Sequence, residues 1–137
     1  MIEKVLEVLI LEDDEAWQKI YTYIFSKRKV VTYITGDKED AFQSLNDHNF
    51  DMAIIDIRLV DTDQTNFDGM DVVRHLQINS PKTTIVVKSG FLTIAIMEEL
   101  LHIGVNYVLD KSESIGNLAS TMNKIEAGLR SGRSIIM

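Results

Sequence analysis

The chain has 137 residues, a formal net charge of -7, 45% hydrophobic residues and no cysteine. This length fits one domain, and the composition is that of a globular protein rather than a disordered or fibrous one. Without cysteine there is no disulfide framework and no thiolate ligand or nucleophile, so a metal site would use oxygen or histidine ligands. The negative charge and the lack of a clustered Lys/Arg patch argue against direct binding of nucleic acid.

The apolar runs are too short to cross a membrane. The longest, such as Met52 to Ile55, fall far below the roughly 20 residues that a span requires, and the N-terminus has no basic-then-apolar secretory pattern. We therefore expect a cytoplasmic protein without membrane contact.

Short runs rich in β-branched residues or leucine recur along the chain and predict buried strands that are apolar on both faces. They are Val5 to Leu11, Val30 to Ile34, Met52 to Ile57, Thr84 to Val87 and Val105 to Leu109. Between them, apolar residues at helical spacing form single stripes. Examples are Trp17, Ile20, Tyr21, Ile24 and Phe25, then Met70, Val73 and Leu76, and finally Leu118, Met122, Ile125 and Leu129.

This alternation predicts an α/β fold, a three-layer (βα)5 arrangement in which a doubly wound parallel sheet carries helices on both faces. Gly128 and Gly132 are expected to mark the end of the last helix. We predict one domain over residues 1–130, followed by a C-terminal tail or linker remnant at 131–137. One loop, Val60 to Asp68, is unusually long and polar and carries three aspartates.

Polar residues cluster where the predicted strands end, which is where open parallel sheets bind their ligands. Acidic residues Glu12 to Glu15 follow the first strand, Asp56 ends the third, Ser89 follows the fourth and Lys111 follows the fifth. Several carboxylates at one edge would repel each other unless a cation shares the site, and Mg²⁺ prefers such oxygen ligands. Acidic residues after a strand can instead cap the next helix, a role we assign to Asp14.

With these residues the sequence resembles the receiver domain of two-component response regulators over nearly its whole length. The motifs that carry the resemblance are Val8-Leu9-Ile10-Leu11-Glu12-Asp13-Asp14, Phe50-Asp51 with Ile54-Ile55-Asp56, Val86-Val87-Lys88-Ser89-Gly90, and Gly104 with Lys111. An acidic pair alone would be weak evidence. An acidic pair, a lone aspartate, a hydroxyl and a lysine, in this order and each at a strand end, are a specific pattern.

The resemblance implies a flavodoxin-like receiver fold and a signalling switch rather than an enzyme acting on a separate substrate. Asp56 would take a phosphoryl group from a sensor histidine kinase or a histidine phosphotransfer protein. Glu12, Asp13, Asp56 and the backbone carbonyl of Arg58 would hold Mg²⁺. Ser89 and Lys111 would contact the phosphoryl oxygens, and an effector domain or a protein partner would receive the signal.

The chain departs from the family pattern at several places. The loop between Asp56 and Gly69 is longer than usual and lacks the common proline. Ser112 replaces the proline after the lysine, so we expect a trans Lys111-Ser112 bond, because a cis bond without proline costs about 3 kcal/mol. Val108 replaces the aromatic switch residue that pairs with Ser89, and its stiff branched side chain has no comparable swing.

Three other classes of protein are weighed against this interpretation. A haloacid-dehalogenase-type phosphatase needs a second aspartate two residues after the nucleophile, where this chain has Arg58. A flavin-binding sandwich needs a Ser/Thr/Gly-rich loop after the first strand, and none is present. A receiver-like interaction module that never gains a phosphoryl group stays open. The histidines His48, His75 and His102 lack metal-ligand spacing and receive no role.

Overall fold

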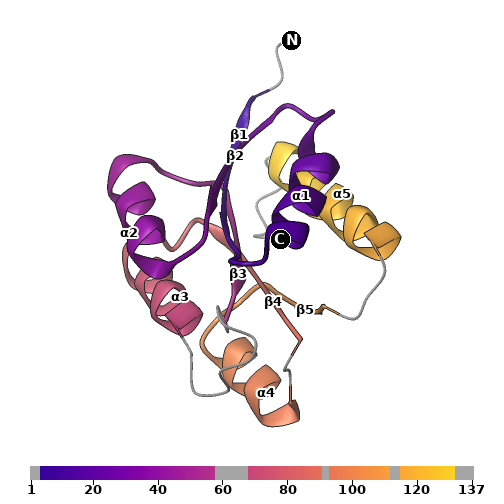
Figure 1. Ribbon diagram of the computed structural model, residues 1–137. Coiled ribbons are helices and arrows are strands. Elements are labelled where there is room, and N and C mark those ends of the chain that lie inside the picture. The colour runs from indigo at the N-terminus through magenta and orange to yellow at the C-terminus, as the bar shows by residue number, and fades with distance from the viewer. Residues whose placement is uncertain (1–3, 58–67, 91–92, 112–114, 132–137) are drawn as a thin grey trace.

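The computed structural model describes residues 4–57, 68–90, 93–111 and 115–131, and within them strands and helices alternate along the chain (Figure 1). The strands are β1 (Leu6–Leu11), β2 (Val30–Thr35), β3 (Met52–Asp56), β4 (Thr84–Ser89) and β5 (Tyr107–Asp110). The helices are α1 (Glu15–Phe25), α2 (Lys38–Asp47), α3 (Asp68–Asn79), α4 (Ile94–His102) and α5 (Ile115–Ser131). The predicted (βα)5 order is confirmed.

The strands form one parallel sheet in the order β2-β1-β3-β4-β5. This is the strand order of the flavodoxin-like fold, in which the connections reverse direction between β1 and β3. Because all strands are parallel, their carboxyl ends meet at one edge. The ends of β1, β3, β4 and β5 are therefore neighbours, although residues of the four strands are far apart in the sequence.

Two layers of helices cover the sheet, and each layer seals one core. On one face, α2, α3 and α4 pack on side chains that include Leu9, Ile55 and Val87. On the other face, α1 and α5 pack on side chains that include Ile10 and Ile54. In Figure 1 the sheet runs between α2 and α3 on one side and α1 and α5 on the other. The alternation of side chains along each strand supplies both cores, as the apolar runs predict.

Polar residues just outside the helices determine where several of them begin. Asp14 caps α1 by accepting a hydrogen bond from the Ala16 amide at 2.8 Å. Asp37 caps α2 through the Asp40 amide at 2.8 Å, and Thr93 caps α4 through the Ile96 amide. Each cap satisfies an amide that has no partner within its own helix. The capping role predicted for Asp14 is confirmed.

The structure corrects three details of the sequence prediction. The strands were expected to be buried on both faces, but β2 and β5 are only partly buried because they form the two edges of the sheet. β5 begins at Tyr107 rather than Val105, because a turn through Gly104, with φ of 97°, comes first. Gly128 does not end the last helix, since α5 continues to Ser131.

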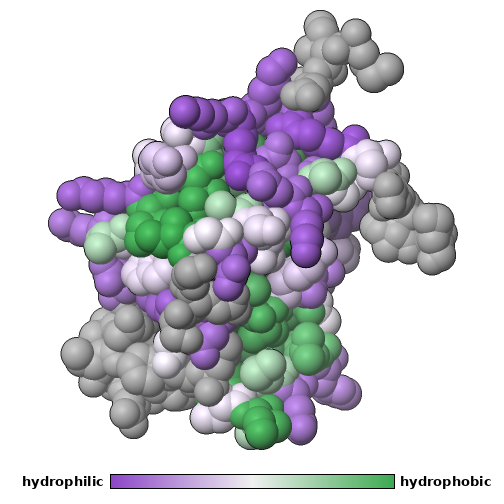
Figure 2. Space-filling model, turned by 90° about the vertical axis from the view of Figure 1, so that its right-hand side faces the viewer, coloured by the Kyte–Doolittle hydropathy of each residue, from purple (hydrophilic) through white to green (hydrophobic). Residues whose placement is uncertain are grey.

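Figure 2 views the molecule from the side of α1 and α5 in Figure 1 and shows apolar patches between hydrophilic areas. Apolar patches lie toward the lower end of this view, at the height where Figure 1 places α4. The exposed apolar residues of α4 include Ile94 and Leu101. No helix among the described residues is long and apolar enough to cross a membrane.

Candidate functional site

The acidic residues predicted from the sequence meet at the carboxyl ends of β1 and β3. Carboxylate oxygens of Glu12, Asp13 and Asp56 all lie within 4.8 Å of one another. Glu12 and Asp56 are only 1% and 2% exposed, whereas Asp13 is exposed to solvent. The group is therefore buried on one side and open on the other, which suits a small oxygen-ligated cation that keeps part of its water.

Lys111 joins this group from the end of β5. Its Nζ lies 2.8 Å from Asp56 Oδ2 and 3.1 Å from Glu12 Oε1, and its side chain is 8% exposed. The Lys111 amide also donates to the Ser89 carbonyl at 3.1 Å, which ties the end of β5 to the end of β4. The lysine is therefore fixed by its backbone and by two carboxylates at once.

Burial and the charges of neighbouring groups change the pKa values of Glu12 and Lys111. Burial, followed by the charge of Asp56, raises the pKa of Glu12 to about 7, against the lowering effect of Lys111. Burial alone would lower the pKa of Lys111, but its hydrogen bonds and charge interactions with Asp56 and Glu12 raise it above the usual value. One lysine thus offsets only part of the negative charge gathered here, and a further cation would complete the neutralisation.

Local contacts hold Glu12 in place. Its Oε2 accepts a hydrogen bond from the Asp14 amide at 3.2 Å, and its carbonyl accepts one from Gln18 Nε2 at 2.6 Å. The Glu12 amide donates to the Thr35 carbonyl of β2 at 2.9 Å. The carboxylate is therefore aimed inward from a short turn that is fastened to both α1 and β2.

Ser89 ends β4 and is fully buried. In the register of the sheet it pairs with Asp110, one residue before Lys111, while its neighbour Lys88 pairs with Asp56. The hydroxyl and the lysine predicted for the site are thus brought to the same edge as the carboxylates.

The model of the response regulator receiver domain family matches residues 8–123 of the chain. The chain belongs to this family. The match covers β2 to β5, β1 from residue 8 onward, and all the site residues predicted from the sequence.

This receiver domain is also similar to part of a longer curated protein. The "Regulator of RpoS" of Escherichia coli strain K12 is 26% identical over 105 residues, which are 77% of this chain and 30% of that protein. The chain thus spans under a third of this curated relative, and the activity of the whole relative does not transfer to it.

Two solved structures show the same fold. A CheY-like receiver domain protein from Methanospirillum hungatei has a TM-score of 0.79 at 16% identity, over 94% of this chain and 100% of that one. A response regulator from Burkholderia pseudomallei has a TM-score of 0.71 at 19% identity, over 89% of this chain and 73% of that one. The latter was solved with a phosphorylated aspartic acid, a calcium ion and citrate.

Some predictions for this receiver domain fall on residues 58–67 and 112–114, outside the described part. They are the Arg58 carbonyl as a metal ligand, the long loop after Asp56, and the trans Lys111-Ser112 bond, which stay predictions. Val108, the position predicted to lack a swing, is partly buried and packs on the core beneath α2, α3 and α4. Its neighbour Tyr107 is 41% exposed.

Gly69, at the start of α3, lies against the backbone that carries Asp56. Its amide donates to the Ile57 carbonyl at 3.3 Å. A Cβ at this position would lie 2.1 Å from the Asp56 carbonyl oxygen and 2.5 Å from the Ile57 Cα, far inside van der Waals contact. Only glycine lets α3 begin this close to the end of β3.

Two further residues beside the site were not predicted to have a role. Lys88 was named only within the motif of the fourth strand and Trp17 only as part of an apolar stripe, yet the Lys88 Nζ lies 3.9 Å from the centroid of the Trp17 ring. The signal available in the sequence was a lysine within an otherwise apolar strand run. Strand alternation places it on the face covered by α1, but the sequence does not show which residue of α1 it meets.

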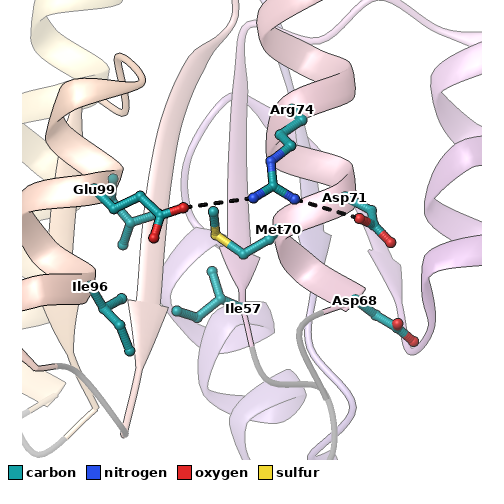
Figure 3. A pocket seen from close by; sticks show the side chains of 8 residues that line it. Ile57, Asp68, Met70, Asp71, Arg74, Ile96 and Glu99 are labelled. Atoms are coloured by element: carbon teal, nitrogen blue, oxygen red, sulfur yellow. Dashed lines mark ion pairs between the residues drawn. The ribbon is translucent and has the colours of Figure 1, made fainter. Parts of the chain in front are cut away.

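A separate cavity of about 440 Å³ lies between α3 and α4 (Figure 3). Ile57, Met70, Ile96 and Leu100 supply its apolar lining. Arg74 reaches toward Asp71 and Glu99 at its rim, at 3.8 Å and 3.7 Å. None of the three clustered carboxylates is among its described lining residues, so the cavity is distinct from the acidic site.

Proposed function

We propose that this receiver domain is a phosphoacceptor that takes a phosphoryl group onto Asp56 and switches the binding of a partner. The observation that carries the proposal is the contact of Lys111 with both Asp56 and Glu12, at 2.8 Å and 3.1 Å, beside a third carboxylate. This arrangement combines a nucleophile, a fixed cation and a set of hard oxygen ligands. Phosphoryl transfer depends mainly on such positioning and charge neutralisation.

The residues present fit a divalent cation, and we propose Mg²⁺. Among the described residues the donors are carboxylate oxygens that lie within 4.8 Å of one another, and burial, followed by the charge of Asp56, raises the pKa of Glu12. Glu12, Asp13 and Asp56 would hold the ion, together with the Arg58 carbonyl predicted from the family. When bound, the ion neutralises charge on the phosphoryl oxygens and on the attacking carboxylate.

The chain's own residues have separate roles in the proposed transfer. An oxygen of Asp56 forms a bond to the phosphorus of a phosphohistidine, and the bond from phosphorus to the imidazole nitrogen breaks with its electron pair left on nitrogen. Lys111 holds the Asp56 carboxylate and then a phosphoryl oxygen. The Ser89 hydroxyl, at the neighbouring strand end, contacts a second phosphoryl oxygen. In this proposal no side chain of the receiver has to transfer a proton.

The donor in this proposal is a sensor histidine kinase or a histidine phosphotransfer protein. The receiver catalyses only its own phosphorylation and dephosphorylation, so we propose a switch and not an enzyme that acts on a separate substrate. Its output passes to an effector domain or a protein partner, without direct contact with nucleic acid or a membrane. A cytoplasmic location belongs to the same proposal.

The test is phosphorylation by acetyl phosphate with and without Mg²⁺, followed by intact mass. We expect a single added phosphoryl group that requires the metal and is absent from Asp56→Asn. Asp47→Asn, which changes an exposed aspartate on α2, is the matched control and should behave as the wild type. A folded wild type that gains no phosphoryl group would instead support an interaction module that is never phosphorylated.

A further inference from the structure

Lys88 is a buried lysine near the carboxyl end of β4. It is 1% exposed and follows the fully buried Val86 and Val87 along β4. Lysine is almost never fully buried unless its charge is compensated, because removing an ammonium from water is costly. Its position in the fold therefore requires a physical reason.

The register of the sheet places Lys88 directly beside the proposed phosphoacceptor. Lys88 and Asp56 are paired across β3 and β4. Side chains alternate along a strand, and Val86 and Ile54, two residues earlier, both face the core beneath α1 and α5. Lys88 and Asp56 therefore point to the same face of the sheet.

The end of the Lys88 side chain is held under α1. Its Nζ lies 3.9 Å from the centroid of the Trp17 ring, a cation–π contact, and 3.5 Å from the carbonyl oxygen of Asp110. Lys111 Nζ lies 6.0 Å from the same ring centroid. The ammonium groups of two lysines therefore lie near one indole ring. Lys111 also contacts the carboxylates of Asp56 and Glu12, and Lys88 contacts the ring itself.

We propose that Lys88 is a second fixed cation of the site, a positioning residue that weakens the binding of the divalent ion and strengthens the binding of the phosphoryl anion. The proposal rests on the function proposed above. Among the described residues, Glu12, Asp13 and Asp56 gather three carboxyl groups beside Lys111, and Lys88 adds a second lysine on the same face of the sheet. A fixed positive charge repels a nearby cation and attracts a nearby anion, and both effects are stronger in a partly buried site than in bulk water.

The test removes the positive charge of Lys88 while keeping a side chain of similar size. Lys88→Met removes the ammonium, Lys88→Arg retains a positive charge, and Lys82→Met removes an exposed lysine before β4 as the control. Mg²⁺ binding is titrated by calorimetry and by the fluorescence of Trp17, which is the only tryptophan of the chain. Only the midpoint of the titration is compared, because removing Lys88 also changes the intensity of the neighbouring indole.

We expect Lys88→Met to bind Mg²⁺ about three- to tenfold more tightly than the wild type, as a charge interaction of this kind at a partly screened site predicts. Its affinity for beryllofluoride, measured at saturating Mg²⁺, should fall by a similar factor. Lys88→Arg should stay close to the wild type in both measurements, and Lys82→Met should match it.

The proposal is wrong if Lys88→Met binds Mg²⁺ with wild-type affinity, or if Lys88→Arg shifts the affinity as much as Lys88→Met does. A Lys88→Met chain that fails to fold also contradicts it, because methionine fits a buried strand position and only a structural need for the ammonium would forbid it. A wild type that binds no Mg²⁺ at all would overturn the proposed function itself, so the two failures are distinguishable.

Discussion

Among single residues, Glu12 most directly links the electrostatics of the site to the stability of the protein. Burial and the charge of Asp56 raise its pKa from 4.5 to about 7. A pKa that is higher in the folded than in the unfolded state means that the folded state binds the proton more tightly. The stabilisation is therefore complete below pH of about 4.5 and is lost as the pH rises through about 7.

We predict that the metal-free protein loses on the order of 3 kcal/mol of unfolding free energy from this residue between these two pH values. Thermal unfolding in the presence of a chelator, followed as a function of pH, measures the loss. Glu12→Gln should remove most of this slope, and added Mg²⁺ should raise stability most at the alkaline end. An identical pH dependence in Glu12→Gln would show that Glu12 is not the group responsible.

The sequence predicted which residues come together at the site only where each of them stands at the end of a recognisable strand. The four residues Glu12, Asp56, Ser89 and Lys111 each stand at the end of an apolar run, so their convergence was visible. The contacts between them join residues 55 and 99 positions apart, as in the pairs Lys111 with Asp56 and Lys111 with Glu12. The contact of Lys88 with Trp17 was missed because it depends on how α1 packs on the sheet.

At the level of helices and strands, the junction of β3 and α3 is the most constrained part of the site. A side chain at Gly69 would overlap the carbonyl of Asp56, so the start of α3 and the position of the proposed phosphoacceptor are linked.

We predict that Gly69→Ala destabilises the protein by about 1–3 kcal/mol, because backbone atoms must shift to make room. Gly128→Ala in α5 is the matched control, since a Cβ there meets no atom within 4 Å, and alanine should stabilise the helix by about 0.5–1 kcal/mol. Chemical denaturation of both variants gives the two values. Equal stability of Gly69→Ala and the wild type would mean that α3 does not pack on Asp56 in this way.

The element bounds differ from their predictions for identifiable physical reasons. Apolar content alone does not distinguish an edge strand from a central one, so the partial burial of β2 and β5 followed only from the strand order. Glycine lowers helix propensity by about 1 kcal/mol, which the packing of Leu118, Met122 and Ile125 on the core outweighs, and α5 therefore continues through Gly128.

For the whole molecule, the question is how the proposed phosphorylation at one edge of the sheet would change the surface. The family uses an aromatic on β5, but here Val108 packs on the core beneath α2, α3 and α4, and Tyr107 faces the other way and is exposed. A valine has one preferred rotamer and cannot fill the space that a moving Ser89 leaves. The signal must then pass along the chain that follows β4.

We predict that activation moves Ser89 and the backbone around Gly90 and Phe91 without a change of an aromatic rotamer on β5. Two structures, with and without beryllofluoride and Mg²⁺, test this. If Tyr107 turns from exposed to buried while the segment after Ser89 keeps its position, an aromatic on β5 takes part in the switch and this account of it fails.

The central claim is that Asp56 carries the phosphoryl group, and its most direct measurement is the position of the acyl phosphate. The wild-type protein is treated with acetyl phosphate and Mg²⁺, the acyl phosphate is reduced with borohydride, and the peptides are mapped by mass spectrometry. We predict a single reduced aspartate, in the peptide that contains Asp56, and none in Asp56→Asn. Reduction at Asp13 or another carboxylate, or no reduction in a protein that binds Mg²⁺, would contradict the claim.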